Sequence, residues 1–503
     1  MSVQLVWFKR DLRIADHEPL LRASEIGPCV GLYVYETELI EAADHDEAHL
    51  NFVNQSLVEL RENLQSLGGE LLLRVGRMPD VLDELSQQIG FEKIWVHEET
   101  FNDLSYQRDR RVRAWAKSKH IPLTELPQYG VVRRLKDRDG WSKQRNERMK
   151  QPPVNKPEKI QLPEGIEKLD AGEIKTAEHF CVHAFERVNV QAGGEQNAAE
   201  CLDSFLQSRG VNYRSDMSSP VTGEKGCSRL SPFIAYGNIS MRTIHHRTEA
   251  RIAELKQQRK SGVAIEPTWL KSLSSFKSRL SWHCHFMQKM EDEPSIEFYN
   301  FNRAYDGLRE DEFNQDYFEA WCHGQTGYPM VDACMRALHQ TGWINFRMRA
   351  MLVSFASYHL WLHWREPALY LARLFIDYEP GIHYSQIQMQ SGVTGINTVR
   401  IYSPIKQVID QDPQGLFIRR YVPELAEVPE KHLAEPHKMT AMEQTLFRCR
   451  IGKDYPEPIV DHRERYKAAR DRIHAHKRLA STREASAKVY QKHGSRKTPS
   501  RRR

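Results

Sequence analysis

The sequence predicts a doubly wound α/β domain with a parallel sheet, followed by an all-α domain. Short apolar runs alternate with amphipathic helical patterns over the first 126 residues, and from Gly194 onward strand patterns nearly vanish. A proline-rich stretch, QPPVNKPEKIQLPEG, lies between the two regions. Strands that alternate with helices form parallel sheets with right-handed crossovers, whereas an uninterrupted series of helical patterns forms an all-α domain.

Five apolar runs are the expected strands. They lie near residues 3–8, 28–35, 70–76, 93–97 and 121–126. Helices fill the gaps, most clearly from Ala48 to Leu67, where leucines and a valine recur along one helical stripe. No G-x-G-x-x-G follows the first run, so we do not expect a dinucleotide at that turn.

The chain divides into four predicted parts. Residues 1–130 form the α/β domain, 131–193 an interdomain linker, 194–460 the helical domain and 461–503 a basic tail. Within the linker, the run RRLKDRDGWSKQRNERMK predicts a solvated connecting face, with phosphate contact as the alternative, and the proline-rich run predicts a wrapping segment. Spacing in the helical domain predicts helices at 195–209, 241–258, 269–290, 315–322, 330–341, 343–364 and 366–376.

The net positive charge of the chain comes from its C-terminal tail. Residues 463–503 hold 15 lysines and arginines against three acids, a net charge of +12, so the remainder carries −7 within the overall +5. We expect a basic helix to about residue 492 and a disordered end, GSRKTPSRRR, at 494–503. Such a tail can bind DNA weakly and in a salt-dependent way, bind a signalling protein, or form a plain solvated surface.

Composition excludes several classes of protein. Hydrophobic residues make up 40% of the chain, and no apolar run reaches the roughly 18 residues that a membrane span needs. The N-terminus, MSVQLVWFKRDLR, meets a charge too early for a signal peptide, so we expect a cytoplasmic protein. Eight cysteines are scattered without a C-x-x-C pair, which argues against disulfide frameworks and iron–sulfur clusters.

Histidine spacing does not indicate a metal site. His45 and His49 in HDEAH lie four apart, but the glutamate is one place late for H-E-x-x-H, so a solvated helix start is expected. His283 and His285 lie two apart, so a helix points them to different faces. The sequence therefore predicts no bound metal.

Residues 321–350 are the most informative stretch. Trp343, Arg347 and Arg349 crowd into the first two turns of the helix that follows 330–341. Cationic and aromatic groups together at a helix start suit a bound anion or a flat ring system. A buried tryptophan beside two solvated arginines is the alternative.

Several motifs carry a resemblance to a known family. They are VWFKRDLRIADHEPL at 6–20, GCSRLSPFIAYGNIS at 226–240, GQTGYPMVDACMRAL followed by GW and RMR, DYEPG at 377–381, RIYSP at 400–404 and DPQGLFIRRYVPEL at 412–425. In order and spacing, nearly the whole chain resembles the photolyase and cryptochrome family. The resemblance implies bound FAD, with a second antenna chromophore, a folate or a deazaflavin, as a possibility that the sequence leaves open.

The resemblance also implies which residues hold FAD. For the phosphates these are Tyr213, Cys227, Ser228, Arg229, Leu230 and Ser231. For the rest of the cofactor they are Arg349, Asp377, Glu379 and His383. An ordinary helix cap at Ser228–Ser231 and a structural Arg–Asp bridge are the alternatives. His383 stands where the family usually has Asn or Asp facing flavin N5, so we expect it to exchange a proton near neutral pH.

The residues that would contact a flipped-out base depart from the family pattern. Trp282 and Trp343 match its aromatic walls, but Arg279 replaces a glutamate and Ala350 a methionine of pyrimidine-dimer enzymes. Phe346 and Ala350 also replace the two histidines of 6-4 photolyases.

The family's electron relay is also interrupted. Trp364 matches its middle tryptophan, Ile387 stands at the flavin-proximal place, and Asp311 lies near the outer one. We therefore expect another route, with Trp361, Trp364, Tyr358 and Tyr402 as candidates and an aromatic core as the alternative for each.

These features predict a cryptochrome-like blue-light receptor, with a light-driven DNA photolyase as the alternative and a structural nucleic-acid binder as a third possibility. The residues expected to carry the photochemistry or base stacking are Trp282, Trp343, His383 and Trp364. Arg279, Arg347, Arg400 and Lys406 are expected to contact DNA. We expect a monomer, with a signalling protein as a possible partner.

Overall fold

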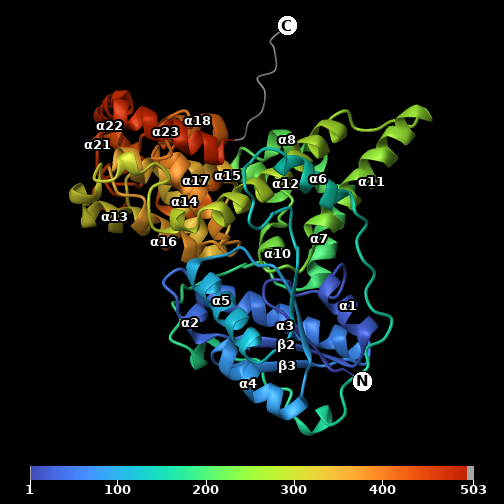
Figure 1. Cartoon of the computed structure of the whole chain (residues 1–503). Coiled ribbons are helices and arrows are strands. Elements are labelled where there is room, and N and C mark those ends of the chain that lie inside the picture. The colour runs from blue at the N-terminus through green and yellow to red at the C-terminus, as the bar shows by residue number, and fades with distance from the viewer. Residues whose placement is uncertain (1, 495–503) are drawn as a thin grey trace.

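The computed structural model describes residues 2–494 and contains the predicted parallel sheet. Its five strands run in the order β3-β2-β1-β4-β5, in the lower half of Figure 1. They are β1 (Gln4–Trp7), β2 (Cys29–Tyr35), β3 (Leu71–Val75), β4 (Lys93–His97) and β5 (Leu123–Leu126). Each strand end lies within two residues of its predicted position, which confirms the α/β prediction.

Helices cover both faces of the sheet. They are α1 (Glu18–Ile26), α2 (Thr37–Ile40), α3 (Glu47–Ser66), α4 (Met78–Ile89) and α5 (Asp103–Ser118). Leu5 and Trp7 of β1 pack in one cluster with α4 and α5, whereas Val6 and Phe8 pack in another with α1 and α3. Because successive strand residues point to opposite faces, this alternation buries the sheet on both sides.

The remaining described chain is largely helical. Its first part holds α6 (Trp141–Lys150), α7 (Glu195–Gln207), α8 (Tyr213–Asp216), α9 (Pro220–Gly226), α10 (Ser231–Ala235), α11 (Met241–Lys260) and α12 (Trp269–Asp292). Its second part holds α13 (Gln315–Cys322), α14 (Pro329–Thr341), α15 (Phe346–Ser354), α16 (Arg365–Leu374), α17 (Pro380–Ser391), α18 (Pro404–Gln411), α19 (Leu416–Tyr421), α20 (Glu430–Leu433), α21 (Ala441–Leu446), α22 (His462–Arg478) and α23 (Ala480–His493). Among residues 2–494, every helix is too short or too polar to span a membrane.

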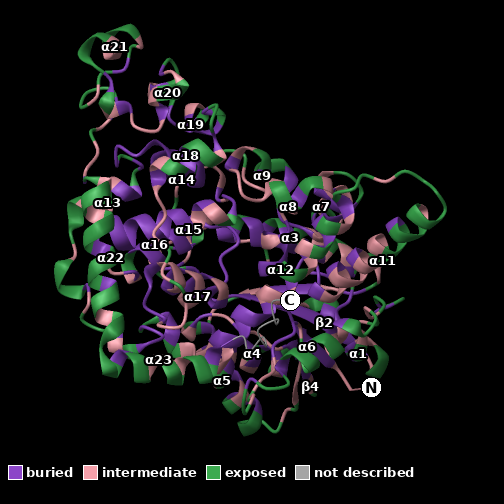
Figure 2. Ribbon diagram, turned by 90° about the horizontal axis from the view of Figure 1, so that it is seen from above, coloured by how far each residue is buried: buried purple, intermediate pink, exposed green. Residues whose placement is uncertain are grey.

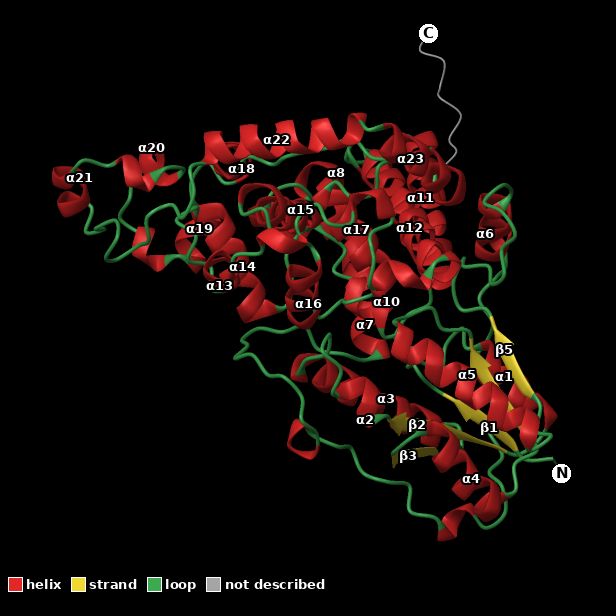
Figure 3. Ribbon diagram, turned by 60° about the vertical axis from the view of Figure 1, so that its left-hand side comes forward, coloured by secondary structure: helices red, strands yellow, loops and turns green. Residues whose placement is uncertain are grey.

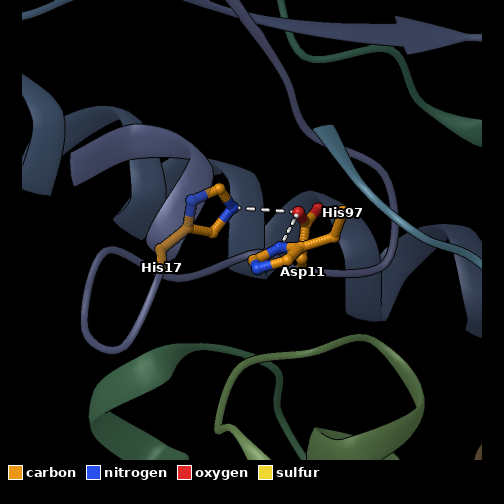
Figure 4. Close-up of side chains that lie close together, drawn as sticks. All are labelled: Asp11, His17 and His97. Carbon is orange, nitrogen blue, oxygen red and sulfur yellow. Dashed lines mark hydrogen bonds and ion pairs between the residues drawn. The ribbon is translucent and has the colours of Figure 1, made fainter. Parts of the chain in front are cut away.

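A buried carboxylate organises the loop after β1 (Figure 4). Asp11 accepts hydrogen bonds from the Lys9 backbone N–H at 2.7 Å, from His17 Nε2 at 2.9 Å and from His97 Nδ1 at 2.7 Å. The same loop meets the helical region, where the Leu12 N–H donates to the Tyr236 carbonyl at 3.1 Å. One acid thereby joins the end of β1, the start of α1 and the end of β4 next to the domain interface.

The linker wraps the sheet, and its arginine-rich part has the largely exposed face that the sequence predicts, with two of its arginines buried. Figure 1 shows the chain after α6 running back along the sheet, where the Ala171 carbonyl accepts from the Leu73 N–H at 2.7 Å. Arg138 and Arg145 are buried, and Arg138 donates to His285 Nδ1 at 2.8 Å. These two arginines are exceptions to the exposed face, because α12 offers them a nitrogen acceptor and a packing surface.

The HDEAH motif also behaves differently from the prediction. His49 is buried, and its Nδ1 accepts from the Asp46 N–H at 3.2 Å while its Nε2 donates to the Phe375 carbonyl at 2.9 Å. It completes a capping box with Asp46 at the start of α3. The helix start is therefore an interdomain contact and not a solvated end.

The predicted helix 343–364 is interrupted. α15 ends at Ser354, a π-helical turn follows over Phe355–His359, and Trp361 then has a left-handed φ of 56°. A buried tryptophan in that conformation is strained, and its surroundings hold it there. Sequence spacing did not reveal the break because residues on all sides of this segment are buried.

The basic tail forms two helices instead of the single predicted one, with the break at Leu479. Figure 3 shows α22 lying along the side of the helical region away from the sheet, and Figure 2 shows an exposed outer face on α22 and α23. Ala469 and Ile473 of α22 pack against Tyr358 and Trp361. The disorder predicted for 494–503 concerns residues that, apart from Gly494, lie outside the described chain.

Close packing of α17 against α12 positions the central residues. A Cβ on Gly381 would lie 2.9 Å from the Met287 Cα and 3.2 Å from the Met290 Cβ. Backbone cannot retreat cheaply from such a contact, so only glycine permits this approach. α17 also packs against α15, so it connects the two helices that carry the predicted flavin residues.

We expect Gly381→Ala to destabilise the protein by about 1–3 kcal/mol, because the added methyl group overpacks the α12–α17 contact. Urea unfolding monitored by circular dichroism measures the change. Gly223→Ala in α9 is the matched control, since its Cβ would meet its nearest neighbours at 3.3–3.4 Å and should cost much less. Equal effects of the two substitutions would contradict the close-packing argument.

Candidate functional site

Arg349 and Asp377 form a bidentate ion pair in the helical region. Arg349 Nη1 donates to Asp377 Oδ1 at 2.9 Å and Nη2 to Oδ2 at 2.8 Å, while Nε donates to the Ile344 carbonyl at 3.0 Å. Burial opposes ionisation of Asp377, but the Arg349 guanidinium outweighs it and holds the pKa of Asp377 below its ordinary value. The pair is therefore charged at neutral pH.

The turn at residues 227–231 lies beside this pair. Arg209 Nη1 donates to the Cys227 carbonyl at 2.7 Å and Nη2 to the Ser228 carbonyl at 3.2 Å. In a trans peptide the N–H points away from the preceding C=O, so the N–H groups of Ser228 and Arg229 point to the other side. That side carries free donors, which suits an anion.

Arg229 is held in an unusual position at this turn. It has a left-handed φ of 62°, and its guanidinium lies 3.9 Å from the Trp343 ring centroid. Burial lowers the pKa of Arg229, with the Asp377 charge acting in the opposite direction. Ser231, which begins α10, also hydrogen-bonds to Asp377. The structure thus brings the predicted phosphate turn and the predicted flavin pair together.

Tyr213 and Cys227 lie next to the turn. Tyr213 packs edge-on against Phe205 at 5.5 Å and against Phe276 at 5.9 Å. Burial raises the pKa of both Tyr213 and Cys227 to about 12, so both side chains are neutral. Leu230 is fully buried and anchors the turn in the core.

Glu379 pairs with a residue to which the sequence had given no role. His283 Nε2 lies 3.1 Å from Glu379 Oε1 and 3.0 Å from Oε2. Burial disfavours the charged imidazole, but Glu379 outweighs it and raises the pKa of His283 to about 10. Arg279, one turn earlier on α12, is exposed, with Nη2 4.0 Å from Met217 Sδ. His285 points elsewhere, as its two-residue offset predicted.

His383 is neutral in this structure. Its Nε2 donates to the Ala368 carbonyl at 2.8 Å, which leaves Nδ1 without a proton. Burial lowers the pKa of His383 to about 4, although the Ala368 bond opposes that shift. The prediction that His383 exchanges a proton near neutral pH was wrong, because its only N–H is already bonded and its cationic form is buried.

The two predicted base-stacking tryptophans have separate surroundings. Trp282 lies 5.7 Å from Phe286, nearly parallel to it, and 5.2 Å from His285. Trp343 lies under Arg229. Nearby, Arg347 Nη2 donates to Ser218 Oγ at 3.3 Å, and Phe346 is 53% exposed. Arg400 and Lys406 are exposed, and Lys406 pairs with Asp410 at 3.4 Å.

The expected electron route falls into two groups. Tyr358 and Trp361 lie beneath α22, with Arg309 4.5 Å and Arg472 4.0 Å from the Trp361 ring. Trp364 is buried elsewhere, beside Tyr384. The sequence reasoning missed Tyr378 and Tyr384, although both lie in the stretch DYEPGIHY that carries the predicted flavin residues.

Asp11, His17 and His97 are the described residues grouped closely enough to hold a metal ion. His17 Nδ1 accepts from the Leu20 N–H at 3.1 Å, so its proton sits on Nε2, facing Asp11. His97 faces Asp11 through a nitrogen that donates in the same way. Nitrogens that donate hydrogen bonds have no lone pair for a metal, so this cluster is a hydrogen-bonded hub.

A small cavity lies at the carboxyl ends of β1 and β2, near the point where strand order reverses. Its volume is about 80 Å³, and aromatic side chains including Trp7, Tyr33 and Phe101 line it. The Arg10 guanidinium lies 3.7 Å from the Phe101 ring and 4.6 Å from the Tyr236 ring. Arg10 therefore occupies the aromatic end of a cavity that stands at the usual ligand position of this sheet type.

Two family models match the chain. One, described as DNA photolyase, matches residues 4–134, and the other, described as FAD binding domain of DNA photolyase, matches residues 276–475. Together they span well over half of the chain. The chain belongs to the photolyase and cryptochrome family. Its helical region accordingly contains the family's FAD-binding domain.

Relatives within the photolyase and cryptochrome family have both kinds of name. A deoxyribodipyrimidine photo-lyase of Alkalihalophilus pseudofirmus is 27% identical over 492 residues, which cover 93% of this chain and 97% of the relative. A cryptochrome DASH of Synechocystis sp. is 29% identical over 497 residues, which cover 93% and 96%. The names alone do not separate a receptor from a repair enzyme.

Solved structures share the fold. A Synechocystis cryptochrome has a TM-score of 0.79 at 26% identity, covering 94% of this chain and 99% of its own. A class III photolyase from Agrobacterium tumefaciens has a TM-score of 0.81 at 24% identity, covering 95% and 98%. An archaeal photolyase from Sulfolobus tokodaii, described with two FAD molecules, has a TM-score of 0.75 at 23% identity, covering 94% and 100%.

The residues present fit FAD. Arg347 Nε and Asn345 Oδ1 are buried without a partner among the described residues, and both lie near the turn and the Arg349–Asp377 pair. Unpaired buried donors and acceptors are costly, and a polar ligand removes that cost. The donor side of the 227–231 turn matches a diphosphate, and the ion pair matches the polar edge of a ring system.

We expect Asp377→Ala to abolish FAD retention. The change leaves the Arg349 guanidinium without its counter-ion, at a cost on the order of 3 kcal/mol, and removes the acceptor beside Ser231. The ratio of flavin to protein absorbance after gel filtration is the measurement. Asp410→Ala, which breaks an exposed ion pair with Lys406, is the control and should keep its flavin. Full flavin content in Asp377→Ala would exclude this pair as the anchor.

The His283–Glu379 pair should make stability depend on pH in the alkaline range. The folded pKa of about 10 lies above the ordinary histidine value of roughly 6.5, so the stabilisation is complete below the ordinary value and lost as pH rises through the folded one. The free energy of unfolding should therefore differ between native protein and His283→Gln by more at about pH 7 than at about pH 10. Denaturant titrations at both pH values test this. A constant difference would mean that the pair is not ionised.

Proposed function

We propose that this chain is a FAD-binding, blue-light-absorbing flavoprotein that acts as a cryptochrome-like photoreceptor. The observation that carries the proposal is the Arg349–Asp377 pair, which lies with Ser231 and Arg229 beside the donor side of the 227–231 turn. Bound FAD supplies blue-light absorption and one-electron transfer. Arg349 and Asp377 orient the ring, and Ser228, Arg229 and Ser231 hold the phosphates.

The surroundings of this site favour a receptor over a repair enzyme. Arg279 is an exposed cation where dimer-repairing enzymes carry a carboxylate, and a guanidinium offers only donors to a pyrimidine N–H. The nearby carboxylate Glu379 is already bonded to His283 through both oxygens. Arg279 thus offers no acceptor to a flipped-out base, and Glu379 is buried with its charge paired to His283.

A light-driven photolyase is the second candidate. Supporting it are the photo-lyase names of several relatives and the exposed side chains Arg279, Arg400, Lys406 and Phe346, which we assign to one DNA-binding face. Cationic and aromatic side chains together bind single-stranded or distorted DNA through phosphates and stacked bases. Either candidate predicts DNA contact at this face.

We assign weak, salt-dependent DNA binding to this face in preference to α22 and α23. Arg472 pairs with Glu312, and Lys492 pairs with Glu293 at 2.9 Å, so part of the tail's charge is neutralised within the protein. The outer face of the tail helices stays exposed and is a surface for a signalling protein. Residues 495–503, which add five more cations, lie outside the described chain.

A second chromophore would occupy the cavity beside Arg10. Aromatic walls suit a folate or a deazaflavin, but about 80 Å³ is well below the roughly 300 Å³ or more of a ligand pocket. Binding therefore requires the Arg10 side chain to leave the space between Phe101 and Tyr236. The Sulfolobus tokodaii structure, with its two FAD molecules, supports a second chromophore in proteins of this fold.

We expect chemically reduced native protein not to repair cyclobutane pyrimidine dimers in duplex DNA under blue light. The double change Arg279→Glu, Ala350→Met should partly restore dimer binding, because it supplies the acceptor whose absence costs about 1–3 kcal/mol. Gel-shift titration and dimer photoreversal are the measurements. Arg400→Glu makes the same charge change away from Trp282 and should not restore binding. Native repair at the rate of an ordinary photolyase would make the lyase function primary.

A further inference from the structure

A column of buried aromatic side chains connects Trp364 with the proposed flavin site. The ring centroids of Trp364 and Tyr384 are 6.1 Å apart, and those of Tyr384 and Tyr378 are 6.4 Å apart. His383 lies 5.1 Å from Tyr378 and 5.3 Å from Tyr384. The column ends beside the ion pair, because Tyr378 follows Asp377 directly and the pKa of His383 responds to both Arg349 and Asp377.

A hydrogen-bonded chain accompanies the column and ends on a carboxylate. The Tyr378 hydroxyl donates to Asp44 Oδ2 at 2.8 Å and lies 3.3 Å from the Tyr384 hydroxyl. The geometry makes the Tyr378 hydroxyl the donor toward both groups, and its single hydrogen goes to the closer acceptor, Asp44. Asn102 Nδ2 also donates to Asp44 Oδ2, at 3.1 Å, and fixes the carboxylate.

The surroundings of the two tyrosines suit loss of an electron coupled to loss of a proton. Burial raises the pKa of Tyr378 and Tyr384, so both phenols are neutral at physiological pH. A phenol that loses an electron becomes a strong acid, and Asp44 is placed to receive its proton. The product is then a neutral radical, which does not add a positive charge to a low-dielectric interior.

Other aromatic groups are worse donors. Trp361 lies between the Arg309 and Arg472 guanidinium groups, and these charges disfavour a tryptophan radical cation. Trp364 Nε1 donates to Asn300 Oδ1 at 2.7 Å, and an amide is too weak a base to remove the indole proton. Ile387 is aliphatic. In the described chain, Tyr378 and Tyr384 are the side chains near the Arg349–Asp377 pair that combine contacts between aromatic rings with a path to a carboxylate acceptor.

We propose that Tyr378 and Tyr384, with Asp44 as proton acceptor, are the light-driven electron donors to the flavin in this protein. The proposal rests on the proposed FAD site. One electron leaves the Tyr378 phenol for photoexcited oxidised flavin, and the phenolic proton moves to the Asp44 carboxylate. Tyr384 then returns an electron and its hydroxyl proton to Tyr378. The balance is a neutral Tyr384 radical, protonated Asp44 and a flavin reduced by one electron.

Flash photolysis of the full-length FAD-bound protein tests this, with electron paramagnetic resonance to identify the radical. We expect a tyrosyl spectrum that narrows when tyrosine deuterated at the β carbon is incorporated, and a slower signal in heavy water. Tyr378→Phe and Asp44→Asn should each lower the yield by about tenfold, equivalent to raising the barrier by about 1.4 kcal/mol. Tyr384→Phe should leave a shorter-lived Tyr378 radical.

Tyr358→Phe, which lies outside the column beneath α22, is the control and should leave the tyrosyl yield unchanged. Each variant is accepted only if its flavin absorbance and unfolding midpoint match those of the native protein. A tryptophan radical in native protein, or an unchanged yield in both Tyr378→Phe and Asp44→Asn, would overturn the proposal while the FAD site stands. Native protein that takes up no FAD would overturn the proposed function itself, and this inference with it.

Discussion

The close approach of α17 to α12 at Gly381 is the constraint on which the site depends. Because a Cβ there would meet Met287 backbone, the two helices can lie directly against each other only with glycine at this position. That distance brings Glu379 within reach of His283 on α12. The residues just before α17 then extend toward α15, where Asp377 meets Arg349. The positions of both charged pairs, Arg349–Asp377 and His283–Glu379, therefore depend on the absence of a side chain at Gly381.

The short segment before α17 distributes its side chains by backbone geometry. Glu379 has extended angles, φ −134° and ψ 112°, and successive residues of an extended chain point to opposite sides. Asp377 and Glu379 accordingly face the α15 and α12 partners, whereas Tyr378 faces Asp44 in the α/β region. Tyr378 therefore has a different partner from the two ion pairs, although it lies directly between Asp377 and Glu379 in the chain.

Sequence patterns predicted the parts of the structure that repeat or that bury one face. The five strands and helices such as α3 and α12 follow from apolar periodicity, and the family motifs led to Arg349 and Asp377. Features that depend on a residue far away in the sequence could not be predicted from such patterns. Burial of Arg145 depends on α12, and the low pKa of His383 depends on its burial by residues far away in the sequence. The π-helical turn at Phe355–His359 lacked a signal because it is buried all round.

Most charged side chains around the proposed flavin are balanced by a partner of opposite charge. Arg349 is balanced by Asp377, protonated His283 is balanced by Glu379, and His383 is neutral. Arg229 remains as the cation nearest the Trp343 ring, and no carboxylate in the described chain forms an ion pair with it at short range. The proposed FAD diphosphate would balance Arg229, whereas an electron added to the ring system would be stabilised by the Arg349 guanidinium of the Arg349–Asp377 pair.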